Sequence, residues 1–443
     1  MNIQLSDHFT YQKLMRFTAP SIMMMIFTSI YSVVDGIFVS NFVGKTPFAA
    51  LNFIFPFIML FSAVGFMLGT GGSALVAKTM GEGKRERANR LFSLFTYTAI
   101  ASGVVIAIVG ILLLRPAAAF LGAEGEMLDY CVAYGRILMA VMPAFMLQTM
   151  FQTFFVTAEK PDLGFKITVG AGITNMVLDW LFIVVFHWGL EGAALATAMS
   201  QVAGGVIPLF YFVRPNSSLL RLTGTSFDGR AMFLACTNGV SELVSNISMS
   251  LVGLLFNVQL MAYAGENGVA AYGIIMYVDF IFLATFIGYS IGSSPVVSFH
   301  YGAGNTDELK NLLRKSVVII GIASVSMFAI AELAARPLSL IFASYDQELL
   351  DMTIHGFRIY AVSFFFVGFA IFGSGFFTAL NNGIVSAIIS FLRTLVFEVI
   401  AVLTLPLIFG LNGIWFAIVL ARGLAIVVTL FFLVKKQPEY RYY

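Results

Sequence analysis

Twelve apolar segments, each long enough to cross a lipid bilayer, restrict the fold of this chain more than any other feature. A membrane-spanning helix needs about 20 consecutive and mostly apolar residues. Of the 443 residues, 59% are hydrophobic and only 11% are charged, whereas an ordinary soluble domain carries about 25% charged residues. We therefore expect an all-α polytopic membrane protein. Its twelve predicted transmembrane helices run over about 14–40, 47–77, 91–114, 131–156, 163–187, 190–213, 231–262, 268–299, 312–335, 354–379, 384–409 and 411–434.

Basic residues between these segments predict the orientation of the chain. If the N-terminus lies inside, 18 of the 25 Lys and Arg residues fall on the cytoplasmic side, 5 fall outside and 2 lie within spans. Because cytoplasmic loops carry an excess of Lys and Arg, we expect both termini in the cytoplasm. The first 17 residues contain an acid and lack a short apolar core with a cleavage site, so we interpret them as mature sequence.

Charge and cysteine content exclude several classes of protein. A formal net charge of +2 gives no argument for a nucleic-acid partner. Cys131 and Cys236 lie more than 100 residues apart in apolar segments, which indicates free thiols and not a metal site or a disulfide framework. No soluble domain or phosphate-binding loop lies between the spans, so we expect no cofactor, no enzymatic activity and no ATPase of its own.

The chain contains two copies of one unit. A shift of 221 positions aligns residues at the ends of the spans in both halves without a gap. These include Gly44 with Gly265, Arg115-Pro116 with Arg336-Pro337, and Gly189 with Gly410. We therefore predict an N-lobe at 1–213, a cytoplasmic linker at 214–230 and a C-lobe at 231–443. Each lobe holds six spans, and an even number gives parallel repeats related by an axis along the membrane normal. Two such lobes are typical of a secondary transporter. The sequence has no segment that resembles a selectivity filter, which argues against a channel.

Two carboxylates lie within the N-lobe spans without a base. Asp35 falls in "IYSVVDGIFVSNF" and Asp179 in "TNMVLDW". Burying two unpaired carboxylates costs several kcal/mol per ion, or forces one to stay protonated. A proton, a metal cation or a cationic substrate must therefore neutralise them.

Helix geometry predicts that these acids share one site. At about 1.5 Å per residue, Asp35, Asp179 and Thr197 lie at similar depths below the outer surface. Asn175 precedes Asp179 by four residues and projects from the same helical face. These four oxygen-bearing side chains would suit Na⁺, with H⁺ competing for the carboxylates. Alternatively, Asn175 and Thr197 only satisfy the acids by hydrogen bonds.

Pro20 lies inside the first span and removes one helical hydrogen bond. It is a candidate hinge below Asp35, although a static kink is the common alternative.

The C-lobe carries a different set of charges within its spans: Glu242, Asp279, Arg393, Glu398 and Arg422. Three acids and two bases can be largely neutralised by ion pairs, which is a purely structural alternative to a functional role.

Three motifs give the chain a family resemblance: "VVDGIFVSNFVG", "GFMLGTGGSALVAKTMGEGK" and "GYSIGSSPVVSFHYGAGN". With these motifs in the first, second and eighth spans, the chain resembles the multidrug and toxic compound extrusion (MATE) family. The likeness extends over essentially all twelve spans. Within the family, the chain is most similar to the DinF-like bacterial branch, in particular to its MepA-like members.

The resemblance implies a pseudo-twofold pair of lobes that exports cationic, amphipathic organic compounds in antiport with Na⁺ or H⁺. Several residues match the cation site and helix hinge of that branch, and Tyr134 and Gln152 would support the same polar network. The matching residues are Asp35, Asn175, Asp179, Thr197 and Pro20. In another branch, coupling acids lie in spans seven and ten; here span ten has no acid, which weakens a C-lobe coupling site.

The expected partners are small cationic molecules and membrane lipid, and we expect a monomer in the bacterial cytoplasmic membrane. Met and Phe residues suit such substrates because Met is adaptable and aromatic faces attract organic cations. We assign Met24, Glu242, Arg393 and Glu398 to the substrate cavity, although core or lipid packing explains most single Met and Phe residues. The alternative function is a flippase for lipids or lipid-linked glycans, which relatives of this fold perform. A cavity for pyrophosphate-bearing lipids should be strongly cationic, and only Arg393 and Arg422 are available.

Overall fold

The computed structural model describes residues 3–343 and 346–442, and helices occupy most of them. The first half of the chain forms α1 (Tyr11–Phe42), α2 (Lys45–Gly81), α3 (Arg85–Phe120), α4 (Gly125–Ala140), α5 (Met142–Thr157), α6 (Pro161–Asp179), the π-helical segment η1 (Trp180–Val185) and α7 (Gly189–Val213). The second half forms α8 (Gly229–Gly302), α9 (Thr306–Ala343), α10 (Gln347–Ala361), α11 (Phe364–Ala379), α12 (Gly383–Phe391), η2 (Leu392–Val396), α13 (Phe397–Phe409) and α14 (Leu411–Tyr440).

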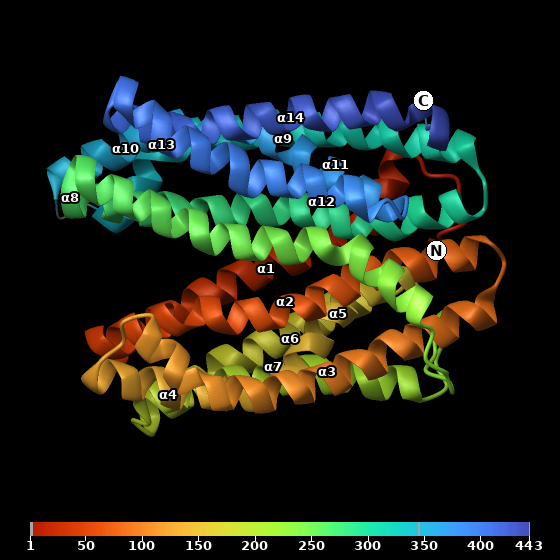
Figure 1. The fold of residues 1–443 in the computed structure, drawn as a ribbon, viewed down its shortest axis with the longest axis horizontal. Coiled ribbons are helices and arrows are strands. Elements are labelled where there is room, and N and C mark those ends of the chain that lie inside the picture. Colours follow the sequence, from red (N-terminus) through yellow and green to blue (C-terminus); the bar gives the residue numbers. More distant parts are fainter. Residues whose placement is uncertain (1–2, 344–345, 443) are drawn as a thin grey trace.

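These helices supply the twelve spans expected from the sequence. In the described part of the chain, nine helices are long and apolar enough to cross a membrane, and two bent pairs add one span each. The pairs are α4 with α5, bent by 60°, and α10 with α11, bent by 50°. The 74-residue α8 would be about 110 Å long if straight, but Gly265 interrupts it with φ 61° and ψ −151°. The chain turns back at this glycine, so α8 contributes two spans (Figure 1).

The helices form two lobes of six spans, as the predicted fold class requires. Figure 1 shows α1–α7 on one side and α8–α14 on the other, with both termini at the same end of the molecule. The backbone repeats along with the sequence, since glycines at corresponding positions adopt positive φ values. These pairs are Gly44 with Gly265, Gly83 with Gly304 and Gly189 with Gly410.

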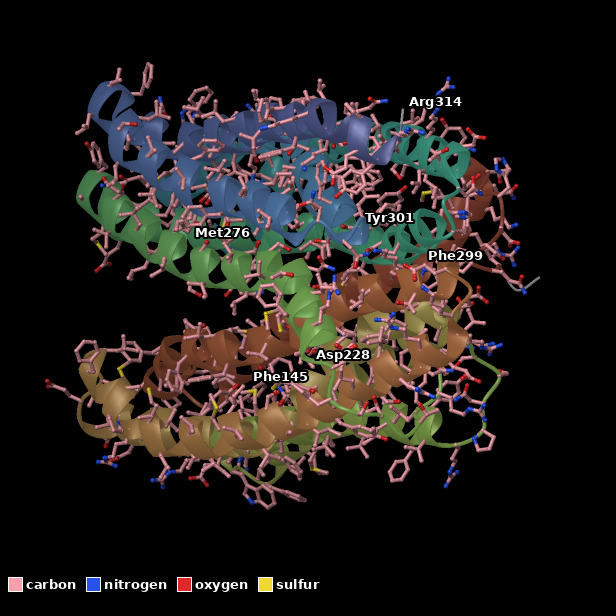
Figure 2. The ribbon with its side chains drawn as sticks, turned by 45° about the vertical axis from the view of Figure 1, so that its right-hand side comes forward. Phe145, Asp228, Met276, Phe299, Tyr301 and Arg314 are labelled. Carbon is pink, nitrogen blue, oxygen red and sulfur yellow. The ribbon has the colours of Figure 1, made fainter. Side chains whose placement is uncertain are left out.

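The lobes touch closely at the end that carries the termini. A Cβ atom on Gly71 of α2 would lie 1.9 Å from the carbonyl oxygen of Ala235 in α8, and one on Gly81 would lie 2.0 Å from that of Phe299. Figure 2 shows Phe299 and Tyr301 at this end of α8, where the Lys78 ammonium lies 5.3 Å from the centre of the Tyr301 ring. Glycine therefore permits a backbone approach that any side chain would prevent. We call these α2–α8 contacts the glycine seam.

The segment before α1 joins both lobes at the same end. The Leu5 N–H donates to Glu159, in the loop between α5 and α6, at 2.6 Å, and burial raises the pKa of the Glu159 carboxyl. On the C-lobe side, the Phe9 N–H donates to Glu308 at 2.9 Å and the Lys315 ammonium donates to the Phe9 carbonyl at 2.7 Å. The N-terminal segment thus reinforces the seam.

Substituting Gly71 with Leu should force the lobes apart at the seam. Overpacking of a close contact typically costs about 1–3 kcal/mol, so the thermal unfolding midpoint in detergent should fall. Cys236, which follows Ala235 in α8, supplies a native reporter, and its labelling by a membrane-impermeant maleimide should accelerate. Gly170→Leu is the matched control because a Cβ at this exposed α6 position meets no atom within 4 Å. Equal behaviour of the two variants would contradict the role of the seam.

Candidate functional site

The N-lobe site is assembled from three helices. Asp35 lies on α1, Asn175 and Asp179 lie in the last turns of α6, and Thr197 lies on α7. The helices α1 and α6 approach closely because Gly172 faces Phe27, whose ring carbon Cε1 lies 2.5 Å from where a Cβ of Gly172 would be. The Ser200 hydroxyl donates to the Ala171 carbonyl at 2.8 Å and fixes α7 against α6.

The side chains at this point leave several buried oxygens without a donor. Within the described residues, Asp35 Oδ1, Asn175 Oδ1 and both carboxylate oxygens of Asp179 are buried and have no hydrogen-bond partner. The Asn175 amide nitrogen donates to Thr197 Oγ1 at 3.4 Å, which leaves the amide oxygen free. The two carboxyl groups also lie close enough together to interact. Unpartnered buried polar atoms are rare because each costs free energy, so this arrangement favours a ligand that supplies positive charge.

The four oxygen-bearing residues fit a cation of the expected kind. Carboxylate and amide oxygens are the ligands of hard cations, and all four unpartnered atoms are of these types. The described residues contain no group of three or more His, Cys, Asp or Glu side chains arranged to hold a metal ion. A site with only two carboxylates suits a monovalent cation that binds reversibly.

Two tyrosines stand beside the carboxyl groups. Tyr134 is 2% exposed and lies near both Asp35 and Asp179. Tyr31 lies near Asp35 and was absent from the sequence interpretation. Its position four residues before Asp35, on the same face of one helix, is the signal that could have identified it.

A change of helix type follows Asp179 directly. The segment η1 begins at Trp180 and has π-helical hydrogen bonding, and η2 on α12–α13 includes Arg393. Such segments are rare and occur frequently at functional sites because they redirect side chains and carbonyl groups. Each lobe therefore has a π-helical segment beside a charged residue of its spans.

Three other predicted residues lie apart from the N-lobe oxygens. Pro20 lies within α1, which is one helix from Tyr11 to Phe42. Gln152 lines a cavity between the two lobes, apart from the oxygens of Asp35 and Asp179. Met24 is only 1% exposed and is not among the cavity-lining residues, whereas its neighbour Met25 is. The Met24 assignment is therefore corrected to Met25, because residues one position apart on a helix face different directions.

The cavity between the lobes has a volume of about 420 Å³ and two kinds of wall. Met25, Phe66, Met276 and Phe280 are among its apolar residues. The charged residues of its C-lobe wall are Glu242, Asp279, Arg393, Glu398 and Arg422. The sequence assignment of Glu242, Arg393 and Glu398 to a cavity thus agrees with their position.

One ion pair neutralises part of this wall. Both Nη atoms of Arg422 donate to Asp279 at 3.1 Å, and Arg422 also donates to the Ser363 hydroxyl at 2.8 Å and the Tyr360 hydroxyl at 2.9 Å. Its guanidinium carbon lies 5.1 Å from the centre of the Tyr360 ring. Every charge of this pair is therefore satisfied, and the expectation of ion pairing in the C-lobe holds for these two residues.

The remaining charges are not paired in this way. Glu242 and Glu398 both lie near Arg393, yet none of the three forms an ion pair within 4.0 Å in the described part of the chain. The Arg393 Nε atom is buried and has no hydrogen-bond partner there. The cavity wall thus keeps one guanidinium and two carboxylates available to a ligand.

The family model described as MatE matches residues 20–181 and 243–403, one match in each half of the chain. The chain belongs to the MatE family.

Known proteins resemble this MatE family member over almost the whole of its chain. The Multidrug export protein MepA of Staphylococcus haemolyticus (strain JCSC1435) is 22% identical over 95% of this chain and 92% of that protein. A solved structure described as the outward-facing conformation of a multidrug resistance MATE family transporter has a TM-score of 0.93 at 23% identity, covering 99% of this chain and 98% of that one. A crystal structure of MATE in complex with MaL6 also gives 0.93 at 23% identity, with 98% of both chains covered. The two-lobe fold is therefore shared along the whole length.

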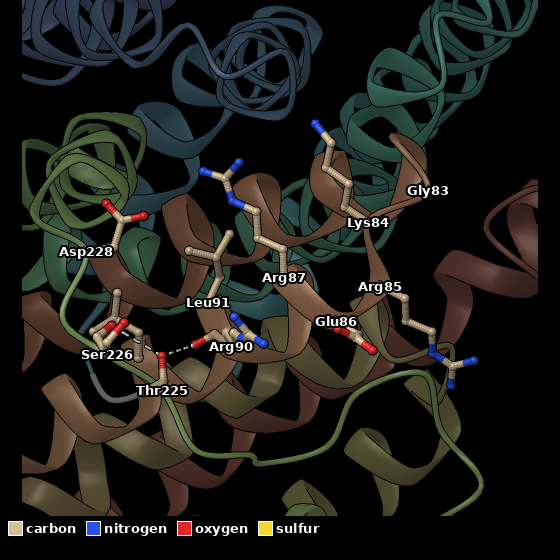
Figure 3. Close-up of a pocket in the computed structure, with 11 residues that line it drawn as sticks. Gly83, Lys84, Arg85, Glu86, Arg87, Arg90, Leu91, Thr225, Ser226 and Asp228 are labelled. Carbon is tan, nitrogen blue, oxygen red and sulfur yellow. Dashed lines mark hydrogen bonds between the residues drawn. The ribbon is translucent and has the colours of Figure 1, made fainter.

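A second hollow of the molecule lies away from both charged sites. It has a volume of about 580 Å³ and lies between the start of α3 and the linker that precedes α8 (Figure 3). Lys84, Arg85, Arg87 and Arg90 line it, and the Thr225 hydroxyl donates to the Arg90 carbonyl at 2.9 Å. These bases belong to the cytoplasmic set expected from the sequence, and the linker is fastened along α3.

Substituting Asp279 with Asn should strongly destabilise the protein. Removal of one partner of a buried ion pair typically costs about 3–5 kcal/mol, because the other charge stays buried and uncompensated. The thermal unfolding midpoint in detergent should therefore fall clearly, and the double substitution D279L/R422M should recover much of it. Asp129→Asn is the control, since the Arg115–Asp129 pair is exposed and such pairs contribute about 0–1 kcal/mol. A D279N midpoint equal to that of D129N would refute the structural importance of the pair.

Proposed function

We propose that this MatE family member is a secondary active transporter that exports cationic, amphipathic organic compounds in antiport with Na⁺ or H⁺. The observation that carries the proposal is the group of buried oxygens of Asp35, Asn175 and Asp179, which have no partner in the described chain. No Lys or Arg side chain forms an ion pair with Asp35 or Asp179 in the described chain, and none stands among their charged neighbours. The name of the MepA relatives, multidrug export protein, supports the same activity.

The coupling ion binds to Asp35, Asn175, Asp179 and Thr197 in this proposal. Na⁺ is a hard cation that accepts carboxylate, amide and hydroxyl oxygens, whereas H⁺ would occupy the carboxylates alone. Tyr31 and Tyr134 stand beside these carboxyl groups, whose unpartnered oxygens remain available to the ion. Ion binding therefore removes net negative charge from a site that is largely closed to water.

A change in the charge of Asp35 affects the rest of the protein through the helix α1. Pro20 lies 15 residues before Asp35 in the same helix, and a proline within a helix lacks one backbone hydrogen bond and is a point of weakness. We propose that ion binding bends α1 at Pro20 or competes with the substrate directly. Either route weakens substrate binding when the ion arrives from outside and allows reloading after the ion leaves to the cytoplasm.

The cavity between the lobes supports the proposed substrate class. Its Met and Phe residues adapt to varied apolar shapes and attract cations through aromatic faces. It is not strongly cationic, because Asp279 neutralises Arg422 and Glu242 and Glu398 face Arg393. This charge balance argues against pyrophosphate-bearing lipids and hence against the flippase alternative.

Substituting Asp35 or Asp179 with Asn should abolish coupled transport. An Asn side chain keeps the shape of Asp but cannot exchange a proton and loses the charge that holds Na⁺, so gradient-driven ethidium export from proteoliposomes should fall more than tenfold. Asp162→Asn is the control, because Asp162 lies on the same helix but is exposed in its first turn. Normal export by both D35N and D179N would contradict the proposed coupling site.

The identity of the ion follows from imposing one gradient at a time. With an inward Na⁺ gradient at equal pH on both sides, ethidium export should run if Na⁺ is the coupling ion. With a pH gradient in Na⁺-free buffer, it should run if H⁺ is the ion. Export that continues unchanged with neither gradient would overturn antiport itself.

A further inference from the structure

The hollow between the start of α3 and the linker contains more bases than acids. Its charged lining residues are Lys84, Arg85, Arg87, Arg90, Glu86 and Asp228. Lys84 pairs with Glu82 at 2.9 Å, but the three arginines form no ion pair in the part of the chain that the structure describes. Figure 3 shows Arg87 and Lys84 extending toward the same side of α3, whereas Arg85 points away from them.

The sequence repeat shows what occupies the corresponding place in the other lobe. Under the shift of 221 positions, Arg87 falls on Glu308, and the linker residues 224–230 fall on the N-terminal residues 3–9. That N-terminal segment packs against the start of α9. There Glu308 accepts a hydrogen bond from the Phe9 N–H at 2.9 Å, and its other oxygen lies 2.6 Å from His8 Nδ1. A carboxylate therefore closes this contact, and Phe9 is buried in it.

A guanidinium in place of this carboxylate leaves the N-lobe copy open. Arginine has five N–H donors and no acceptor, so Arg87 cannot bind a backbone N–H of the linker as Glu308 binds that of Phe9. The linker is still fastened to α3, because the Thr223 N–H donates to Ser93 at 2.8 Å and the Thr225 hydroxyl donates to the Arg90 carbonyl at 2.9 Å. Neither bond uses a guanidinium. The hollow of about 580 Å³ thus presents cationic donors that suit an acceptor from outside the chain.

Apolar residues beside the hollow indicate that this acceptor belongs to the membrane. Leu91 and Leu94 line the hollow where α3 enters its predicted span. Phe227 lies in the linker between the lining residues Ser226 and Asp228, and its side chain is 77% exposed. Aromatic residues concentrate at membrane–water interfaces, and basic pockets on the cytoplasmic side of membrane proteins bind anionic lipid headgroups. A small soluble anion would need no such apolar border.

We propose that the hollow binds the phosphate headgroup of an anionic phospholipid from the cytoplasmic leaflet. Arg87 and Arg90 hold the phosphate by charge-assisted hydrogen bonds, for which the guanidinium fork is well shaped. Lys84 adds positive charge, and the acyl chains extend past Leu94 into the bilayer. The bound lipid contacts both α3 of the N-lobe and the linker that leads into α8 of the C-lobe.

Native mass spectrometry of the purified full-length protein in detergent tests this site. The probes are dioleoylphosphatidylglycerol, which is anionic, and dioleoylphosphatidylcholine, which has the same acyl chains and no net charge. The wild type should bind phosphatidylglycerol more tightly than phosphatidylcholine. The double substitution R87Q/R90Q should weaken phosphatidylglycerol binding about tenfold or more, because two charges that attract the phosphate are lost. The R87K/R90K variant keeps both charges and should weaken binding less.

A matched double substitution separates this site from general attraction to anionic lipid. K310Q/R314Q removes two exposed bases of α9 that lie outside the hollow, and it should leave the affinity for phosphatidylglycerol unchanged. An equal loss in both glutamine variants, or equal binding of the two lipids by the wild type, would overturn the proposal. Size-exclusion profiles and unfolding midpoints show whether each variant is folded.

A competitor without acyl chains distinguishes a lipid from a soluble phosphate. Glycerol 3-phosphate carries the same phosphate as phosphatidylglycerol but has no apolar part. At the concentration at which phosphatidylglycerol binds, it should neither bind nor displace the lipid. Displacement of the lipid at that concentration would assign the hollow to a soluble anion and contradict the lipid site.

Discussion

The cost of holding unpaired carboxylates away from water is the constraint on which the arrangement of this protein depends. Asp179 is fully buried and so is Asp35 Oδ1, and neither that atom nor the Asp179 carboxylate has a hydrogen-bond partner in the described chain. No basic residue stands among the charged neighbours of the two acids. In a medium of low dielectric, such a pair is unstable unless positive charge is bound. If an ion binds there, as we propose, the most stable state of the site differs between the ion-bound and the ion-free protein. The helices α1, α6 and α7 hold it by tight packing at Gly172 and Ala171.

The duplication explains how one chain can carry two chemically different sites. The repeat sets the spans, the positive-φ glycines at the turns and the two bent helix pairs. It does not set the charges within the spans, since Asp35 and Asp179 match Phe256 and Ile400, and the charged residues of the cavity wall also match neutral residues of the N-lobe. The backbone symmetry favours rocking of similar lobes about a cavity, while the divergence of side chains places the unpaired carboxylates in one lobe and the charged wall of the cavity in the other.

Much of the fold follows from local sequence, but the sites follow only in part. The spans are predictable because about 20 apolar residues have one stable form in lipid. The interruption of α8 at Gly265 also agrees with the sequence prediction. Gly265 aligns with Gly44 in the repeat, and it lies between two predicted spans. Asp35, Asn175, Asp179 and Thr197 could be grouped by depth along their helices. Depth does not give the direction in which a side chain points, and for this reason Met24 was assigned to the cavity in place of Met25. The ion pair of Asp279 with Arg422 joins α8 to α14 across 143 positions, and no pattern in a single sequence distinguishes that pairing from one with Glu398.

The helix α1 connects the ion site with the contacts that hold the lobes together. Its inner half lies against α8 at two glycines: a Cβ on Gly288 would be 2.5 Å from the Ile22 Cα atom, and one on Gly292 would be 3.0 Å from that of Thr18. Asp35 lies on the same helix about 20 Å away at 1.5 Å per residue, and Pro20 lies between Thr18 and Ile22. Contacts this close tolerate little movement because packed interfaces have few alternative arrangements. A bend of α1 at Pro20 would therefore separate Thr18 and Ile22 from α8 rather than compress the contact. The proline is positioned where a change of charge at Asp35 could act on the closed end of the transporter.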